Sequence, residues 1–470
     1  MKRINDPFIQ AYGTKQVPFR FRGRDFRFDL SHGLFSSADI DTGTKFLLKV
    51  LSRQWDSDLR EGRPLPRSVL DAGCGTGVMG ICAAKVLAEE PRREAAEGPP
   101  FVRAQDRDEL ARGFTEANAR LNGIPPSLLS AHTEPLLSGP PGISWDLIMS
   151  NIPAKAGTPI LEDFAGRAAA MLSPNGRVLI VAVNPLAELF RSRIREESFT
   201  VYHDETGKDH TVFMYGRAGT AGARHGKTGT PPAETGFLSA NPEYLRGRGE
   251  YRIEDISYRI TAIHGVPDFD TPGSGVQTAA KLVTKLNIAK YFSLPGPASD
   301  NAILVHEPDQ GHFPVWLSAY LGRGTEPGLR FVLSGRNILA LEASRLNLRA
   351  ASENFPAAAE EPALVPAADL LLARDRLLEI LAGDIPGRPG AQRYGFIAAF
   401  PETVPRTDRF GACWEALESL LAPGGIAVLA LPSTEADRFE RKKIPGFTRM
   451  GDLKKHGFRA LAYRRAAPEN

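Results

Sequence analysis

A glycine-rich segment at residues 68–80 constrains the fold of this chain more than any other feature. It begins with a short apolar strand that ends in an acid, Asp71, and it continues into a loop with three glycines: Gly73, Gly75 and Gly77. Glycine lets the backbone turn sharply and lets a ligand approach without a Cβ in its way, at the amino end of the following helix. The segment also matches the spacing G-x-G-x-x-G, which by itself is a weak signal. A ligand-binding strand–loop–helix unit is therefore expected, and the rest of the chain must indicate its ligand.

Residues 1–217 carry strand and helix signals in alternation. Apolar runs typical of buried strands alternate with stretches of helical periodicity, and residues 199–215 read as a hairpin. One helix is expected just before the glycine strand, at residues 45–51, with Thr42 or Thr44 as its N-cap. This order predicts a doubly wound parallel sheet with an antiparallel edge.

Residues with useful chemistry follow the ends of several of these strands. Asp106 ends the strand after the glycine loop, and Asn151-Ile-Pro153 follows the strand at 145–150. Ligands of doubly wound sheets bind beyond the carboxyl ends of the strands, so we expect Gly73–Gly77, Asp106 and Asn151 to converge on one crevice. A carboxylate at Asp106 suits bidentate contact with ribose hydroxyls.

Two features favour S-adenosylmethionine over NAD as the ligand. Asp71 lies two residues before the first glycine, where its carboxylate can meet a ligand ammonium group, which NAD lacks. Asn151 and Pro153 offer an amide oxygen and constrained backbone carbonyls, which can accept hydrogen bonds from a planar amine and direct its lone pair at a methyl group. An ordinary strand-to-helix turn explains Asn151 and Pro153 equally well, because both residue types form turns.

Taken in order, these pieces resemble the small-domain class I methyltransferases, specifically the ribosomal RNA guanine-N2 methyltransferases. The matching segments lie between Gly33 and Gly216: Gly33–Ser36, Asp41–Thr44, Val69–Gly77, Asp106 with Asn118, Asp146–Gly157, and His210–Phe213. The resemblance implies a Rossmann-like fold and S-adenosylmethionine as the cofactor. It implies the following site: Gly73, Gly75 and Gly77 at the methionine end, Asp71 at the ammonium, Asp106 at the ribose, His132 or Thr133 at the adenine, and Asn151 and Pro153 at the acceptor amine.

The chain departs from the family in the loop that resembles N-P-P-F-H-x-G. Ile152 replaces the first proline, Ala154 replaces the aromatic residue that would stack on the target base, and Lys155 replaces the histidine. Loss of a stacked ring removes about 1–3 kcal/mol of base binding. Methyl transfer to nitrogen stays expected, because Asn151 and Pro153 remain, but a protein side chain or a small molecule becomes an alternative acceptor.

Residues 17–30 alternate aromatic and basic side chains, which is typical of a strand with one apolar and one basic face. Interleaved arginines and rings such as Arg20, Phe21 and Arg22 could hold RNA through phosphate contacts and stacking. An edge strand with a solvated basic face is the other interpretation.

The order of elements recurs in the second half. Residues 218–250 are rich in Gly, Thr, Ala and Pro and read as a linker between a catalytic domain at 1–217 and a second domain at 251–470. Asn347 follows Gly335 by twelve residues, as Asn118 follows Asp106. We therefore expect tandem doubly wound (Rossmann-like) class I methyltransferase domains.

The second domain is expected to be degenerate, with a role in substrate binding or a structural role. Aligning Gly311 with Gly75 places Glu307 at Asp71, and it places Asp309 and Phe313 at Gly73 and Gly77. Side chains there would fill the space of the cofactor. A basic group near the end of the chain could contact phosphates or form a solvated face: Arg441, Lys442, Lys443, Lys454, Lys455, Arg464 and Arg465.

Composition limits the remaining possibilities. The net charge is only +3, so any nucleic-acid surface must be local. The three cysteines have neither metal-site spacing nor the number for a disulfide framework, which favours a reduced intracellular protein without a metal. No apolar run approaches the ~20 residues of a membrane span, and the amino terminus lacks a secretory signal, so a cytoplasmic protein is expected.

The sequence as a whole predicts an S-adenosylmethionine-dependent N-methyltransferase, most simply of guanine N2 in ribosomal RNA. The partner is then RNA, free or within a ribosomal subunit. A methyltransferase of a protein side chain or small molecule is one alternative. A non-catalytic RNA-binding assembly factor is another, and the intact Asp71, Asp106 and Asn151 argue against it.

Overall fold

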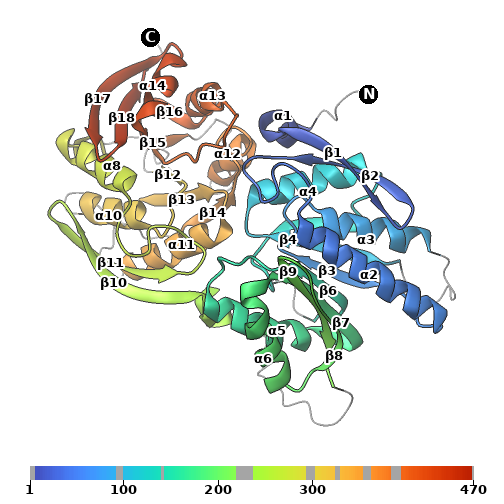
Figure 1. Cartoon of the computed structure of the whole chain (residues 1–470). Helices are drawn as coiled ribbons and strands as arrows, with labels where there is room; N and C mark the ends of the chain where they lie inside the picture. The colour runs from blue at the N-terminus through green and yellow to red at the C-terminus, as the bar shows by residue number, and fades with distance from the viewer. Residues whose placement is uncertain are drawn as a thin grey trace. The chain divides into compact units, whose positions relative to one another are not determined.

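Two seven-stranded sheets with flanking helices make up this 470-residue protein (Figure 1). The computed structural model describes residues 6–90, 99–138, 142–218, 237–292, 302–322, 329–352, 361–382 and 393–467. The chain divides into two compact units, residues 1–235 with 404–406 and residues 236–403 with 407–470. The expected α/β class is confirmed. Of the expected linker, residues 219–236 lie outside the described part, and described elements begin again at Phe237.

The first sheet has the strand order β5-β4-β3-β6-β7-β9-β8. Its strands are β3 (Ser68–Ala72), β4 (Phe101–Asp106), β5 (Leu129–Thr133), β6 (Trp145–Asn151), β7 (Leu172–Val183), β8 (Thr200–Thr206) and β9 (His210–Gly216). Strands β3 to β7 pair in parallel, and β9 and β8 add an antiparallel edge, as the sequence predicts. The winding direction reverses between β3 and β6, where α/β sheets bind their ligands.

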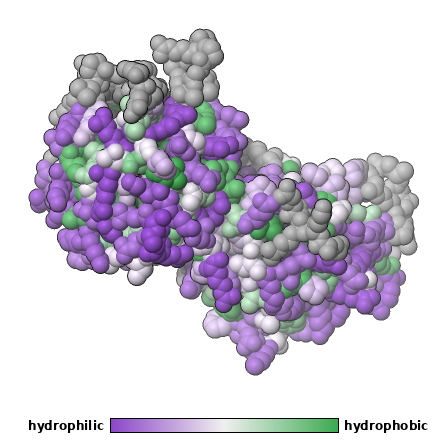
Figure 2. All heavy atoms as spheres, turned by 90° about the horizontal axis from the view of Figure 1, so that it is seen from above, coloured by the Kyte–Doolittle hydropathy of each residue, from purple (hydrophilic) through white to green (hydrophobic). Residues whose placement is uncertain are grey.

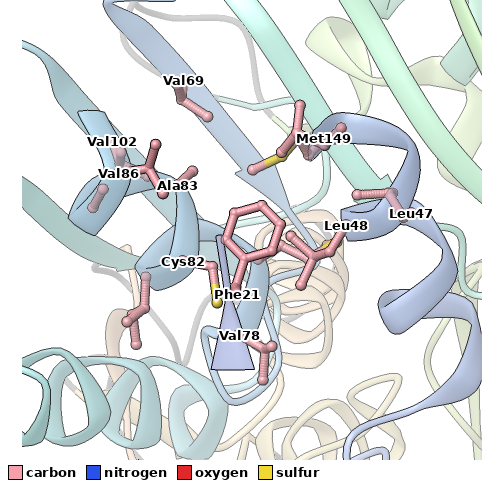
Figure 3. Close-up of a cluster of buried hydrophobic side chains, with 14 of the residues drawn as sticks. Phe21, Leu47, Leu48, Val69, Val78, Cys82, Ala83, Val86, Val102 and Met149 are labelled. Carbon is pink, nitrogen blue, oxygen red and sulfur yellow. The ribbon is translucent and has the colours of Figure 1, made fainter. Parts of the chain in front are cut away.

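Helices and a hairpin cover this sheet. They are α1 (Pro7–Tyr12), α2 (Thr42–Arg60), α3 (Val78–Glu89), α4 (Glu109–Leu121), α5 (Thr158–Ala170), η1 (Asn184–Leu186), α6 (Ala187–Glu196), and the paired strands β1 (Lys15–Phe21) and β2 (Arg24–Leu30). Figure 3 shows the core on one face, where apolar side chains of β1, α2 and α3 meet the sheet: Phe21, Leu47, Leu48, Val78, Cys82, Ala83, Val86, Val69, Val102 and Met149. Burial of such side chains is the main stabilising contribution to the unit.

Helix α2 is longer than predicted and begins differently. It extends to Arg60 because apolar residues continue at helical spacing as far as Trp55, which is buried. The expected N-cap at Thr42 or Thr44 is wrong. Asp41 caps the helix, since its side chain accepts the Thr44 N–H.

The β1–β2 hairpin uses its rings and its arginines within the fold. Phe21, Phe26 and Phe28 are buried, so they cannot stack on bases. Arg22 Nη1 lies 2.7 Å from Asp56 Oδ1, and Arg24 Nε lies 2.6 Å from Glu89 Oε2. The structure therefore supports the solvated-face interpretation of residues 17–30 and not the RNA interpretation.

Asn118 on α4 links the hairpin to the glycine loop. Its Nδ2 donates to the carbonyls of Asp29 (3.1 Å) and Thr76 (2.9 Å), and its Oδ1 accepts the Asp29 N–H at 2.8 Å. All of these groups are buried. An unmade hydrogen bond is costly in such a place, so one side chain fixes the loop against β2.

The second unit has a sheet with the order β14-β13-β12-β15-β16-β18-β17, which repeats the first order position by position. Its strands are β12 (Ala302–His306), β13 (Arg330–Gly335), β14 (Ala363–Pro366), β15 (Tyr394–Ala399), β16 (Leu421–Pro432), β17 (Phe447–Lys455) and β18 (Phe458–Arg465). A hairpin of β10 (Leu245–Ile253) and β11 (Ile256–Ile263) precedes them. The helices are α7 (Phe237–Ala240), η2 (Pro242–Tyr244), α8 (Ser274–Lys285), α9 (Ala289–Phe292), α10 (His312–Leu321), α11 (Ile338–Ser352), α12 (Arg374–Ala382), α13 (Phe410–Leu420) and α14 (Ser433–Arg441).

The same polar link recurs here. Asn347 Nδ2 donates to the carbonyls of Thr261 (3.0 Å) and Gln310 (2.8 Å), and its Oδ1 accepts the Thr261 N–H at 2.8 Å. Asn347 on α11 therefore joins β11 to the loop after β12, as Asn118 joins β2 to the loop after β3.

Backbone geometry corrects the alignment of the two loops by two residues. Gly77 and Gly311 both precede a helix with a left-handed φ (83° and 90°), and each N–H donates at 2.8 Å to the carbonyl three residues earlier. Gly311 therefore corresponds to Gly77 and not to Gly75. Glu307 and Asp309, with φ of 56° and 49°, then stand level with Gly73 and Gly75. The sequence alignment failed because it matched a glycine by identity, while the turn conserves conformation.

The visible molecular surface in Figure 2 is mainly hydrophilic, with apolar residues in small separate groups. Few large apolar side chains of the described residues are exposed: Phe35, Leu59, Phe101, Val201, Tyr202 and Leu245. None of the described helices is long and apolar enough to cross a membrane.

Substitution of Asn118 tests the link between hairpin and loop. We expect Asn118→Ala to lower the free energy of unfolding of the first unit by about 2–3 kcal/mol, because buried backbone groups of Asp29 and Thr76 lose their partners. Hydrogen–deuterium exchange should then speed up in β2 and in residues 73–77. Asn122→Ala is the matched control, since Asn122 makes exposed hydrogen bonds to the backbone of Arg27 in the same strand. Equal exchange in both variants would contradict the expectation.

Candidate functional site

The carboxyl ends of β3, β4 and β6 bring the predicted residues together. Gly75 N–H donates to Asp106 Oδ2 at 3.0 Å, which joins the glycine loop to the end of β4. Ser150 Oγ donates to the Ala72 carbonyl at 2.7 Å, which sets the end of β6 beside the end of β3. The glycine loop, Asp106 and Asn151 thus lie together at the carboxyl-terminal ends of the central strands, as the sequence predicts.

Asp71 lies beneath this loop and is fully buried. Its Oδ2 accepts the Gly80 N–H at 2.8 Å, whereas its Oδ1 has no hydrogen-bond partner among the described residues. Burial raises the pKa of Asp71 to about 7, helped by the nearby Asp106 and opposed by the Gly80 N–H. A buried carboxylate oxygen without a partner fits a ligand that carries a hydrogen-bond donor or a positive charge.

The three loop glycines have left-handed φ values of 79°, 55° and 83°. At Gly77 a Cβ would lie 2.9 Å from Thr115 Cγ2, so close packing against α4 requires glycine there. At Gly75 a Cβ would meet nothing within 4 Å. Gly75 therefore borders open space at the start of α3, where N–H groups and the helix dipole favour a negatively charged ligand group.

Asp106 presents its carboxylate at the same edge. Its Oδ2 accepts the Gly75 N–H and its Oδ1 accepts the Asp108 N–H at 3.1 Å, which fixes both oxygens. Burial and the Asp108 charge raise the pKa of Asp106, and these two N–H groups act in the opposite direction. Each oxygen keeps a further lone pair, so the group can accept hydrogen bonds from a pair of hydroxyls.

His132 and Thr133, the two candidates for an adenine contact, lie on opposite faces of β5. His132 pairs in register with Gln105 on β4, whereas Thr133 pairs with Asp106. Neighbouring residues of a strand point to opposite faces, so Thr133 and not His132 shares the face of Asp106. The His132 ring bonds Ser130 Oγ at 2.9 Å, and burial together with the nearby Arg103 charge lowers the pKa of His132.

Asn151 is the last residue of β6, and hydrogen bonds hold its side-chain amide through Nδ2 only. Its Nδ2 donates to Asp41 Oδ2 at 2.9 Å and to Thr44 Oγ1 at 3.1 Å. In the described residues no donor reaches its Oδ1, which stays available as an acceptor. The Pro153 carbonyl accepts the Ala156 N–H at 2.9 Å, so Pro153 closes a turn. Ala154 and Lys155 in that turn are exposed.

Sequence reasoning missed four contributors to the site. Asp41 enters the sequence analysis only through the resemblance, and Thr44 only through the resemblance and as a candidate N-cap. No sequence pattern indicates a role for Leu136. Its Cδ2 lies 3.2 Å from the position of a Cβ on Gly73, so it covers the loop. Gln105 holds Leu136 there by donating to its carbonyl at 3.0 Å.

Two of the cysteines lie in or just after the glycine loop. Cys74 and Cys82 are buried and free, and burial raises the pKa of both thiols far above the usual range. Across the described residues no group of three or more His, Cys, Asp or Glu side chains could hold a metal ion.

Comparison with known proteins identifies the first unit. Residues 25–204 match the family described as "Methyltransferase small domain". The chain is 36% identical over 125 residues to a ribosomal protein L11 methyltransferase of Rhodopseudomonas palustris, which covers 25% of this chain and 38% of that protein. It is 29% identical over 167 residues to a ribosomal RNA small subunit methyltransferase C of Chromohalobacter salexigens, which covers 35% of this chain and 44% of that protein. The chain thus spans less than half the length of each of these two relatives.

One solved structure shares the fold of nearly the whole chain. It is the Thermus thermophilus 16S rRNA N2 G1207 methyltransferase in complex with AdoMet and guanosine, with a TM-score of 0.57, 16% identity, and coverage of 97% of this chain and 99% of that chain. The features of the site fit S-adenosylmethionine: an unpartnered buried carboxylate oxygen, open space at Gly75, and a fixed carboxylate at Asp106. Residues 25–204 of this chain therefore belong to the methyltransferase small domain family and form an S-adenosylmethionine-dependent methyltransferase domain.

Proposed function

We propose that this protein methylates the exocyclic N2 amine of guanine in ribosomal RNA. The observation that carries the proposal is the fixed amide of Asn151 beside the glycine loop, with its oxygen free to accept from a planar amine. The similarity to a 16S rRNA guanine-N2 methyltransferase over 97% of this chain supports the choice of acceptor.

In this proposal one set of residues binds the cofactor and another orients the acceptor amine. Asp71 accepts from the ammonium group of S-adenosylmethionine, Gly73, Gly75 and Gly77 border its methionine end, and Asp106 accepts from its ribose hydroxyls. The cofactor supplies a methyl group on a sulfonium sulfur, which becomes a neutral thioether once the acceptor nitrogen has taken the methyl. Asn151 Oδ1 orients the amine, and Pro153 shapes the turn that follows. The amine loses one proton to water.

Positioning is then the main catalytic contribution of the protein, because the methyl group is already activated. A guanine within a duplex must leave the stack to reach the end of β6. His132 stays a prediction as an adenine contact, although Thr133 has the better position next to Asp106.

A ribosomal protein is the second candidate acceptor. The L11 methyltransferase of Rhodopseudomonas palustris is the more identical relative, and Ala154 leaves no ring for stacking on a base. The exposed Lys155 favours RNA, since it can neutralise a phosphate of a bound nucleotide.

A labelling experiment separates these candidates. The protein and radiolabelled cofactor are incubated with ribosomal subunits, free ribosomal RNA and ribosomal protein from a strain lacking the gene. We expect label in RNA as N2-methylguanine, and Asn151→Ala should lower kcat by about 100-fold or more with little change in cofactor affinity, because the oriented acceptor is lost. Label only in protein would disprove the RNA acceptor. A normal rate for Asn151→Ala would remove Asn151 from the mechanism.

We also propose that the second unit is a degenerate copy of the first. The matching strand orders and the matching links of Asn118 and Asn347 support a duplication. Glu307 Oε1 accepts the Arg336 N–H at 2.9 Å, and its Oε2 lies 2.9 Å from the position of a Cβ on Gly335. Gly335 corresponds to Asp106, so the carboxylate of Glu307 takes the place of the Asp106 side chain.

Domain limits at 217 and 251 and a cytoplasmic location remain predictions. The degenerate unit would assist in RNA binding through its basic residues. Arg464 and Arg465 donate to the backbone carbonyls of Gly424 and Leu421, and of the group predicted from sequence only Arg465 is partly buried. The other members are exposed: Arg441, Lys442, Lys443, Lys454, Lys455 and Arg464.

Cofactor stoichiometry tests the degenerate copy. We expect one S-adenosylmethionine per chain in titration calorimetry, because Glu307 and Asp309 occupy the loop of the second unit. Asp106→Ala should weaken binding at least about tenfold, which equals about 1.4 kcal/mol. The control Glu307→Gln should leave the affinity unchanged. Two equivalents bound, or a loss of affinity with Glu307→Gln, would contradict degeneracy.

Affinity for the cofactor should depend on pH through Asp71. Its pKa is about 7 in the folded protein and 3.8 ordinarily, so between these values the folded state holds a proton that the unfolded chain has released. Stability of the cofactor-free protein therefore falls as pH rises through this window. A bound ammonium favours the ionised carboxylate. Below pH 7, the affinity for the cofactor should therefore rise by up to about tenfold for each unit by which the pH is increased.

Calorimetry in buffers of different ionisation enthalpy measures the protons released on binding. Asp71→Asn should release fewer protons and show a flatter pH profile than the parent protein, and Asp106 accounts for the remainder. An unchanged profile would show that Asp71 does not meet the ammonium group.

A further inference from the structure

We propose that Asp41 is a positioning residue of the acceptor site: it fixes the orientation of the Asn151 amide so that Oδ1, and not Nδ2, faces the acceptor amine. The inference deepens the proposed function and rests on it, because it concerns how the same amine is held. Asp41 is 110 residues from Asn151 in sequence, yet the two side chains are hydrogen-bonded at 2.9 Å.

The chemistry of the carboxylate decides the orientation. Ionised Asp41 can only accept hydrogen bonds, so the group that faces it must be the donor Nδ2 of Asn151. The reversed amide would place Oδ1 against a negative charge and leave it without a donor. Thr44 Oγ1 adds a second acceptor for the same Nδ2 at 3.1 Å. The opposite end of the amide is Oδ1, which the proposed reaction needs.

Asp41 is itself held rigidly. As N-cap of α2 it accepts the Thr44 N–H through the same Oδ2 at 3.0 Å. A helix of 19 residues with a buried apolar face thereby carries the orienting carboxylate. The charge also polarises the amide, which makes Oδ1 a stronger acceptor.

Gly43 supplies the space for this arrangement. A Cβ there would lie 2.8 Å from Asp41 Oδ2 and 3.1 Å from His210 Nε2. The first contact is closer than real Cβ atoms adopt and the second is tighter than most, so a side chain at 43 would displace the carboxylate and press on the ring. In the segment Asp41-Thr-Gly-Thr44, Asp41 thus orients the amide, Gly43 leaves the space that this needs, and Thr44 is the second hydrogen-bond acceptor.

A simple structural role for Asp41 predicts different results from a positioning role. Asp41→Ser keeps an N-cap for Thr44 but is too short to reach Asn151. We expect kcat for methyl transfer to fall at least tenfold, with cofactor affinity within about twofold of the parent and the midpoint of thermal unfolding unchanged. Asp41→Asn should retain activity within about threefold, because its Oδ1 can accept both N–H groups. Asp39→Asn is the matched control in the same loop, since Asp39 bonds Lys45 and not Asn151.

A residue exchange gives the sharpest test. Asn151→Asp alone sets two carboxylates against each other and should be at least about 100-fold slower than the parent. In the double variant Asp41→Asn with Asn151→Asp, the hydrogen bond is reversed: the new amide donates to the new carboxylate, whose other oxygen is free for the amine. We expect the kcat of the double variant to be at least tenfold higher than that of Asn151→Asp. A double variant no faster than Asn151→Asp, or an Asp41→Ser variant with normal kcat, would overturn the proposal.

A spectroscopic readout separates this inference from the proposed function. In protein labelled with 15N-asparagine, the side-chain NH2 signal of Asn151 is assigned by its loss in Asn151→Asp. Asp41→Ser should shift that signal, while Asp39→Asn should not. An unshifted signal overturns the orientation by Asp41 even if RNA is the acceptor. A shifted signal supports the orientation, even where the parent protein methylates protein and the RNA acceptor fails.

Discussion

Three left-handed glycines at the end of β3 set the geometry of the catalytic unit. Their turn lets Gly77 N–H bond the Cys74 carbonyl, so α3 begins directly after the strand. The same turn aims the Gly75 N–H at Asp106, and α3 approaches β3 closely enough for the Gly80 N–H to reach Asp71. A Cβ on Gly80 would lie 2.9 Å from Asp71 Oδ2, so this approach also depends on a missing side chain. One loop conformation therefore fixes the relative positions of β3, β4 and α3.

The second unit keeps the conformation of this loop with other residues at two of the three glycine positions. Glu307 and Asp309 adopt positive φ values that cost of the order of 1–3 kcal/mol each for residues other than glycine. Side chains of α11 hold the loop in this shape: Ser344 Oγ donates to the Asp309 carbonyl at 3.1 Å, and Asn347 to the Gln310 carbonyl. Thr115 and Asn118 make the corresponding bonds in the first unit. The turn therefore persists with one glycine, Gly311, in place of three, because contacts from α11 support its conformation.

Sequence patterns predicted the parts of the structure that depend on local periodicity. The order of strands and helices, the antiparallel edge and the residues at the ends of β3, β4 and β6 follow from apolar runs and turn residues. The face of His132, the cap of α2 and the partners of Arg22 and Arg24 depend on register and on residues distant in sequence. The bond between Asp41 and Asn151 is of this second kind. A motif shows which residue types are present, but only tertiary contacts show which of their atoms remain free.

The charges around Asn151 bear on the kind of amine the site can hold. Asp41 is the carboxylate bonded to Asn151, and its Oδ2 already accepts from Asn151 and from the Thr44 N–H. In the proposed reaction the acceptor amine would meet the neutral amide oxygen of Asn151, while the Asp41 carboxylate is bonded to the nitrogen of the same amide. A neutral planar amine, such as that of a nucleobase, suits this oxygen, whereas a protonated lysine would lose its hydration and meet a neutral amide oxygen before any carboxylate. The exposed Lys155 in the adjoining turn adds repulsion for a cation and attraction for a phosphate. Electrostatics thus favours a nucleobase over a lysine ammonium, although the stacking ring of the family is absent at Ala154.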